Sequence, residues 1–474
     1  MELHGDDISF APLTPRSRPR RVMVYLLLIL LGGMLDWALL SGQVTPPNPF
    51  APTPTPTRTA ISWAEEGQAQ FLAGDLDAAI QAYQMATRLE PKNGRLWAEL
   101  ARIQVYSSAL LPTDEQKYHR RQEALKAADR AVEVAPDDAR THAIRAFALD
   151  WLATSNLTGA EAHDRWLAEA ENEASRALTL SKNDPLALAF YAEVLLDQQR
   201  WLQANRDAEL AVGYGPNLLD THRVYAAVLE TLGQYNKAIE EYKKAIQLAP
   251  NLTIFYLRVG LIYRHLAGSA QASSLYRDTL YEQALTYFDK AAKINQRLGI
   301  DDPTPYIAIA KTYAQKGDFF AAEQNAERAL LMNPSNPNTY AELGIIYIKA
   351  RNYEGAVPVL KCAVEGCTTQ ESEALLKDIA RRFIGFDQVQ GVPVAPLPLT
   401  DRTVGFYYAS YGSVLAALDR CSEALPVLDK VERAFPADPV LTGIIRENRA
   451  ICRTLNATPT PVLPTPTAAP SPTP

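Results

Sequence analysis

Four cysteines are the residues of this chain whose type could support covalent chemistry, and all lie in its last third: Cys362, Cys367, Cys421 and Cys452. Cysteine thiols can pair as disulfides in an oxidising compartment or bind zinc. Their spacing does not resemble a zinc site, because no histidine lies near them. We therefore expect disulfides, with four buried thiols as the alternative.

The sequence contains no short motif of a common catalytic site. A Gly-x4-Gly-Lys phosphate loop, a Gly-x-Ser-x-Gly elbow and a His-Glu-x-x-His pair are all missing. The six histidines are scattered, which predicts surface or turn positions for His4, His119, His142, His163, His222 and His265. We therefore predict a protein that is not an enzyme and has no cofactor or metal site. The net charge of −7 and the lack of a basic face argue against nucleic-acid binding.

A 34-residue period positions these residues. The unit Leu219–Leu252 and the unit before it carry small or large apolar residues and a proline at matching offsets: Ala226, Ala238, Tyr242, Ala245 and Pro250, then Ala192, Ala204, Ala208, Ala211 and Pro216. Small residues allow two helices to pack closely, and proline ends the second helix. Such a period predicts stacked helical hairpins that hold other proteins.

The string Tyr340-x2-Leu343-Gly344-x2-Tyr347, followed by Ala356 and Leu360, resembles a tetratricopeptide repeat (TPR). Similar strings occur nine times over residues 59–455, the last followed by a capping helix near Val440–Leu455. The resemblance implies an all-α, right-handed solenoid. Three insertions, Ser107–His119, Thr154–Ala162 and Ser269–Leu280, are expected to lengthen its turns. A fourth, Thr369–Arg402, starts helix-like, and its Gly391–Thr400 end is either ordinary loop variation or a segment that packs on the solenoid or binds a partner.

In a TPR superhelix the first helix of each repeat lines the concave face. The resemblance therefore implies a peptide-binding groove of cations and apolar residues in repeats five to eight: Arg223, Leu257, Arg258, Leu261, Arg264, Ile307, Lys311, Ile345 and Lys349. Such a groove suits a peptide that carries carboxylates, and ordinary variation of helix surfaces is the alternative. The repeat also implies that Cys421 and Cys452 end adjacent helices and pair, which leaves Cys362 and Cys367 as a local pair.

The N-terminal region predicts export of the repeats. Residues 22–40 are apolar except for Gly32, Gly33 and Asp36, and an arginine cluster precedes them within residues 1–21. By the positive-inside rule we expect a cytoplasmic tail, a membrane-spanning anchor and an extracytoplasmic repeat domain. A cleaved signal peptide is the alternative. Residues 41–58 and 456–474 are rich in proline and threonine, which predicts a linker and a disordered tail.

The sequence as a whole predicts a membrane-anchored, extracytoplasmic TPR scaffold that binds proteins or peptides. The alternative is an accessory subunit that presents substrates to envelope enzymes.

Overall fold

The computed structural model describes residues 19–41, 58–269, 273–383 and 389–457. The chain divides into two compact units, Met1–Arg58 and Thr59–Pro474. The predicted linker at 42–57, most of the N-terminal tail and the predicted tail from 458 onward lie outside the described residues.

The first unit contains the helix α1 (Pro19–Leu40), which holds the segment predicted to span a membrane. Within the described part of the chain, no helix is both long and apolar enough to cross a membrane. The predicted anchor at residues 22–40 is therefore not supported. Gly32, Gly33 and Asp36 interrupt its apolar run.

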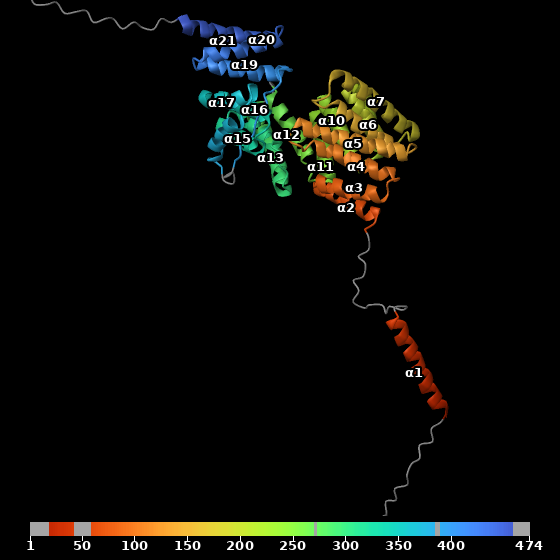
Figure 1. Ribbon diagram of the computed structural model, residues 1–474. Helices are drawn as coiled ribbons and strands as arrows, with labels where there is room; N and C mark the ends of the chain where they lie inside the picture. Colours follow the sequence, from red (N-terminus) through yellow and green to blue (C-terminus); the bar gives the residue numbers. More distant parts are fainter. Residues whose placement is uncertain (1–18, 42–57, 270–272, 384–388, 458–474) are drawn as a thin grey trace, which may run out of the picture. The chain divides into compact units, whose positions relative to one another are not determined.

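The second unit is an all-α solenoid whose helices pair into hairpins in chain order (Figure 1). Over its described residues there are nine hairpins: α2 (Ala60–Ala73) with α3 (Leu76–Leu89), α4 (Gly94–Ser108) with α5 (Asp114–Val134), α6 (Ala139–Ala153) with α7 (Ala160–Leu180), α8 (Pro185–Asp197) with α9 (Trp201–Tyr214), α10 (Leu219–Thr231) with α11 (Tyr235–Leu248), α12 (Thr253–Gly268) with α13 (Ser274–Leu298), α14 (Thr304–Lys316) with α15 (Phe319–Met332), α16 (Pro337–Lys349) with α17 (Tyr353–Val364), and α19 (Arg402–Ala417) with α20 (Cys421–Ala434). The helix α18 (Thr369–Ala380) lies between the last two hairpins, and α21 (Pro439–Ala457) follows them.

Small residues set the spacing inside each hairpin, as the period predicts. A Cβ atom added to Gly260 would lie 2.5 Å from the Phe288 ring, and one added to Gly412 would lie 2.7 Å from Leu428. The alanines that follow in the second helices, such as Ala238 and Ala245, have no exposed surface. Glycine and alanine are required there because a larger side chain would separate the two helices.

In several repeats the proline at the end also joins the repeat to the next one. Its carbonyl oxygen accepts a hydrogen bond from a side chain six residues later: the Tyr256 hydroxyl lies 2.8 Å from the Pro250 oxygen, and His222 Nε2 lies 2.8 Å from that of Pro216. His142 makes the same contact with Pro136. His142 and His222 are therefore buried, and their prediction as surface or turn residues was wrong.

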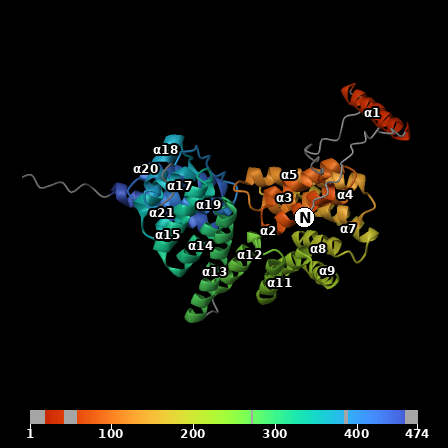
Figure 2. The same ribbon diagram turned by 90° about the horizontal axis from the view of Figure 1, so that it is seen from below.

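Most of the inserted residues extend helices instead of turns. The second helices α5 and α7 have 21 residues and α13 has 25, whereas α3 has 14. The long α13 packs against both α12 and α14 (Figure 2). These hairpins are therefore longer than their neighbours because their second helices start earlier in the sequence.

The Gly391–Thr400 segment packs onto the solenoid. Val394 forms a β-bridge with Cys367, and Val394 and Leu397 are buried. The Leu397 amide donates to the Ala363 carbonyl at 2.8 Å, and the Tyr408 hydroxyl donates to the Leu397 carbonyl at 2.8 Å. Side-chain burial and these hydrogen bonds make the segment part of the fold between the eighth and ninth hairpins.

All four cysteines are paired. Cys421 is bonded to Cys452 with a Cα–Cα distance of 5.6 Å, and Cys362 to Cys367 with one of 4.7 Å. These are the pairs that the sequence analysis predicts. Cys421 is the first residue of α20, not the last of the preceding helix as expected, and Cys452 lies on α21. Through Leu441 and Ile445, which are buried, α21 covers the end of the array.

Candidate functional site

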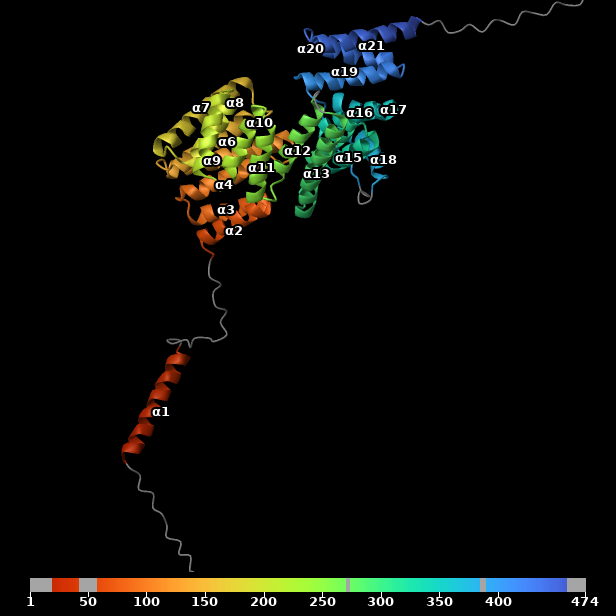
Figure 3. The same ribbon diagram turned by 180° about the vertical axis from the view of Figure 1, so that it is seen from behind.

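The first helices of the early repeats do not line an open groove. α4 packs on α6, α6 on α8 and α8 on α10 (Figure 3). Aromatic rings fill the space between them, with Phe147 stacked on Phe190 at a centroid distance of 4.4 Å and Tyr106 tilted against Phe147 at 5.8 Å. The concave side of this part of the solenoid is therefore a packed core.

A buried charge network crosses that core between α4 and α10. The Arg102 guanidinium lies 2.8 Å from the Asp220 carboxylate, and the Tyr106 hydroxyl donates to the same carboxylate at 2.6 Å. All three side chains are buried. Burial opposes ionisation of Asp220, but Arg102 outweighs it and holds the pKa of that carboxyl below its ordinary value. The network thus links helices that are more than a hundred residues apart in sequence.

Arg223 belongs to this network and not to an open groove. Its guanidinium donates two hydrogen bonds to Glu193, at 2.5 and 2.6 Å, and a third to the Tyr106 hydroxyl at 2.9 Å. It also lies 5.0 Å from the centre of the Phe147 ring. With 6% of the residue exposed, Arg223 offers no donor to an incoming peptide. Glu193 occupies a concave repeat position, so the offsets could have placed it near Arg223, but they do not show that both side chains are buried.

The early repeats also contact the sixth repeat across the rim of the solenoid. The Asn251 amide donates to the Leu72 carbonyl at 3.2 Å, and Arg297 donates to the Asn251 side chain. A cavity of about 270 Å³ beside this contact is lined by Gly74 and Leu298 among others. The first hairpin therefore lies against the loop before α12 and against the end of α13, which closes this turn of the solenoid.

An open concave face remains on the later first helices, α12, α14, α16 and α19. Four predicted apolar groove residues on the first three of these helices are only partly buried: Leu257, Leu261, Ile307 and Ile345. The contacts between successive first helices are sparser here than among α4, α6, α8 and α10. We call the surface of these four helices the open face.

Two of the predicted cations on the open face are already paired. Arg258 lies 2.7 Å from Glu230, and Lys311 lies 2.6 Å from Glu342. Glu342 also accepts a hydrogen bond from the Tyr407 hydroxyl at 2.5 Å. Burial, reinforced by Glu342, raises the pKa of Tyr407, so its hydroxyl stays protonated. Glu230 and Glu342 occupy concave repeat positions, so the offsets that selected the cations could have found their partners too.

The other two cations on the open face have no carboxylate in contact among the described residues. Arg264 donates to the Ala308 carbonyl at 3.3 Å and lies 5.8 Å from the centre of the Phe288 ring. Burial lowers the pKa of this guanidinium, and Glu342, which is not in direct contact, only partly offsets the effect. Lys349 is exposed at the end of α16. Arg264 and Lys349 are thus the cations that can still take an anionic partner.

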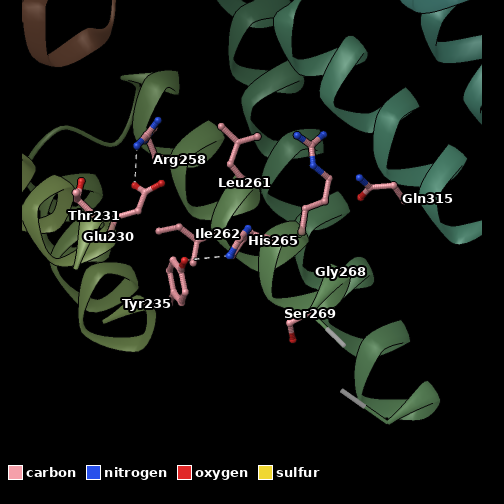
Figure 4. Close-up of a pocket in the computed structure, with 11 residues that line it drawn as sticks. Glu230, Thr231, Tyr235, Arg258, Leu261, Ile262, His265, Gly268, Ser269 and Gln315 are labelled. Atoms are coloured by element: carbon pink, nitrogen blue, oxygen red, sulfur yellow. Dashed lines mark hydrogen bonds and ion pairs between the residues drawn. The ribbon is translucent and has the colours of Figure 1, made fainter. Parts of the chain in front are cut away.

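A cavity of about 590 Å³ opens beside these residues, and Arg258, Leu261 and Arg264 line it (Figure 4). In the described part of the chain, no group of three or more histidine, cysteine, aspartate or glutamate side chains could hold a metal ion. The lining combines the two arginines with apolar side chains and with hydroxyl and amide groups.

Comparison with known proteins identifies the repeats. A family model described as TPR repeat matches residues 231–265, and one described as Tetratricopeptide repeat matches residues 307–370. The chain is a TPR protein. The matched segments cover the turn and second helix of the fifth hairpin, the start of the sixth, and the seventh and eighth hairpins.

Relatives of this TPR protein are distant. A BBSome complex member BBS4 homolog from Drosophila melanogaster is 22% identical over 171 residues, which are 35% of this chain and 34% of the relative. The chain thus matches about a third of the length of that relative. A human IFIT1 dimer solved with m7Gppp-AAAA is 16% identical, with 81% of this chain and 92% of that chain covered and a TM-score of 0.44. A TPR protein from Parabacteroides merdae is 14% identical, with 60% and 93% covered and a TM-score of 0.39.

Proposed function

We propose that this TPR protein is a scaffold whose open face holds a carboxylate-bearing segment of a protein partner. TPR arrays of this kind are scaffolds for protein–protein interactions and are typically not catalytic. The observation that carries the proposal is the contrast between the two halves of the solenoid. The early first helices bury their concave side, whereas the open face keeps apolar side chains partly exposed beside two unpaired cations.

The charges of the open face favour an anionic partner. The four predicted groove cations Arg258, Arg264, Lys311 and Lys349 face two partner carboxylates, Glu230 of α10 and Glu342 of α16, which leaves a surplus of two positive charges in this set. A positive surface on a chain of net charge −7 concentrates acidic segments and speeds their encounter. The apolar residues between the cations supply area to be buried.

We also propose that the array works in an oxidising compartment, outside the cytoplasm, as its sequence predicts. The pairing of all four cysteines supports this location, because disulfides persist where thiols are not kept reduced. The curated relative is named as a member of a complex, and we propose that this chain likewise works as a subunit of an assembly.

Two matched double variants test the open face. Asn338→Asp with Lys349→Glu makes the net charge of α16 more negative by three, and Asn236→Asp with Lys243→Glu makes the same change on α11, a second helix. All four residues are exposed, so neither variant should disturb packing. The amount of cross-linked partner recovered with each variant is the measurement. We expect about tenfold less partner with the α16 variant at low salt, and the wild-type amount with the α11 variant. Equal capture by both variants would show that binding does not use the open face.

A further inference from the structure

The solenoid splays between its fifth and sixth hairpins. The first helices α8 and α10 pack together, but α10 and α12 make at most marginal direct contact, although α12 packs on α11. The 590 Å³ cavity occupies this gap: Glu230, Thr231 and Tyr235 line one side, α12 lines the other, and Gln315 of α14 closes it from a third direction (Figure 4). A cavity of this size is in the range of ordinary ligand sites.

Two contacts bridge the cavity and hold its sides at a fixed separation. Glu230 of α10 reaches Arg258 of α12 at 2.7 Å, and the Tyr235 hydroxyl lies 2.9 Å from His265 Nε2, with their rings 5.0 Å apart (Figure 4). Glu230 also accepts a hydrogen bond from Tyr242 at 3.2 Å. Glu230, the one carboxylate among the described residues of the lining, is thus already engaged by two donors.

The lining has a surplus of hydrogen-bond donors. Among the described residues, the partly buried Arg264 guanidinium contacts one carbonyl oxygen and one ring, and Gln315 adds an amide group. The Thr231 and Ser269 hydroxyls already donate to the Ala227 and Leu266 carbonyls, so they can only accept from a ligand. A partly desolvated guanidinium with no carboxylate in contact gains more interaction free energy from an anionic acceptor than from a neutral one. A carboxylate fits best, because its two oxygens can accept two parallel N–H hydrogen bonds from the guanidinium. Leu261 and Ile262 supply an apolar wall.

We propose that the cavity between α10 and α12 binds a carboxylate of the partner polypeptide, with Arg264 as its anchor. This inference rests on the proposed function and names the group that the open face recognises. Both a chain-terminal carboxylate and an aspartate or glutamate side chain offer this chemistry. Arg258 and Lys311 are not anchors, because their charges are taken by Glu230 and Glu342.

The test uses fluorescently labelled peptide pools of random sequence and the full-length chain. One pool has a free C-terminal carboxylate and no acidic residue, a second is amidated and carries one glutamate, and a third is amidated without acidic residues. Binding is followed by fluorescence polarisation for the wild type, Arg264→Gln, Arg264→Lys and Gln315→Ala. Arg206→Gln is the matched control, because Arg206 is an exposed arginine on the second helix α9.

We expect the wild type to bind the first or second pool and not the third, and the pool that binds identifies the source of the carboxylate. Arg264→Gln should weaken that binding about tenfold to a hundredfold. Arg264→Lys should restore part of it, and Arg206→Gln should change nothing. Gln315→Ala should weaken the peptide binding by a smaller factor. Because Gln315 is exposed, this variant should fold normally, so it still tests the site if the Arg264 variants are unstable.

Equal binding of all three pools, or binding unchanged by Arg264→Gln and Gln315→Ala, would overturn the carboxylate site. If the α16 charge variant still reduces partner capture in that case, the proposed function stands and only the carboxylate site at Arg264 is refuted. If no pool binds the wild type, the carboxylate site is refuted, whatever the capture experiment shows.

Discussion

Replacing Arg223 with alanine is expected to lower the free energy of unfolding by about 3–5 kcal/mol, the usual loss when one partner of a buried ion pair is removed. The guanidinium satisfies both oxygens of Glu193 and the Tyr106 hydroxyl, so alanine leaves Glu193 buried with Trp151 as its remaining hydrogen-bond donor. Urea denaturation followed by tryptophan fluorescence measures the change.

The control replaces both partners at once. Arg223→Met with Glu193→Met removes the two charges together and leaves apolar side chains of similar length, so its stability should lie much closer to that of the wild type. A loss below about 1 kcal/mol in Arg223→Ala would mean that the carboxylate reaches water and that this half of the solenoid is open.

Removing the Cys421–Cys452 disulfide by alanine substitution should destabilise the end of the array by about 2–4 kcal/mol. The bond joins α20 to α21 across a sequence separation of 31, whereas Cys362 and Cys367 are separated by only 5. Because a disulfide that closes a longer loop restricts the unfolded chain more, the matched Cys362→Ala/Cys367→Ala variant should lose less stability. Thermal melting of both variants measures the difference.

Non-reducing peptide mapping of the wild type supplies the check on this second prediction. Peptides that contain Cys421 and Cys452 should appear joined in protein taken from its natural compartment. Four free thiols there would contradict both the pairing and the proposed oxidising location.

Much of the fold follows from residue type and spacing. Gly260 and Gly412 mark where two helices meet, and Pro216 and Pro250 mark where a repeat ends, because these effects act within one hairpin. The insertions were placed correctly in sequence but expected as turns. They extend α5, α7 and α13 because their residues continue the helical pattern of the second helix.

The site was harder to predict because its charges are partnered across hairpins. The repeat offsets place Arg223 and Arg264 in equivalent first helices, but they do not reveal how tightly successive repeats curve. That curvature buries Arg223 against Glu193, and the splay between α10 and α12 leaves Arg264 beside a cavity. Whether a residue on the concave face is accessible therefore depends on contacts between repeats. The sequence of a single repeat does not predict those contacts.

Amide hydrogen exchange of the full-length chain, with and without the partner recovered by capture, tests the central claim most directly. We expect partner binding to slow exchange in α12, α14 and α16 and to leave α4, α6 and α8 unchanged, because only the later first helices offer an open face. Protection of α4, α6 and α8 without any change in α12 to α16 would contradict the account.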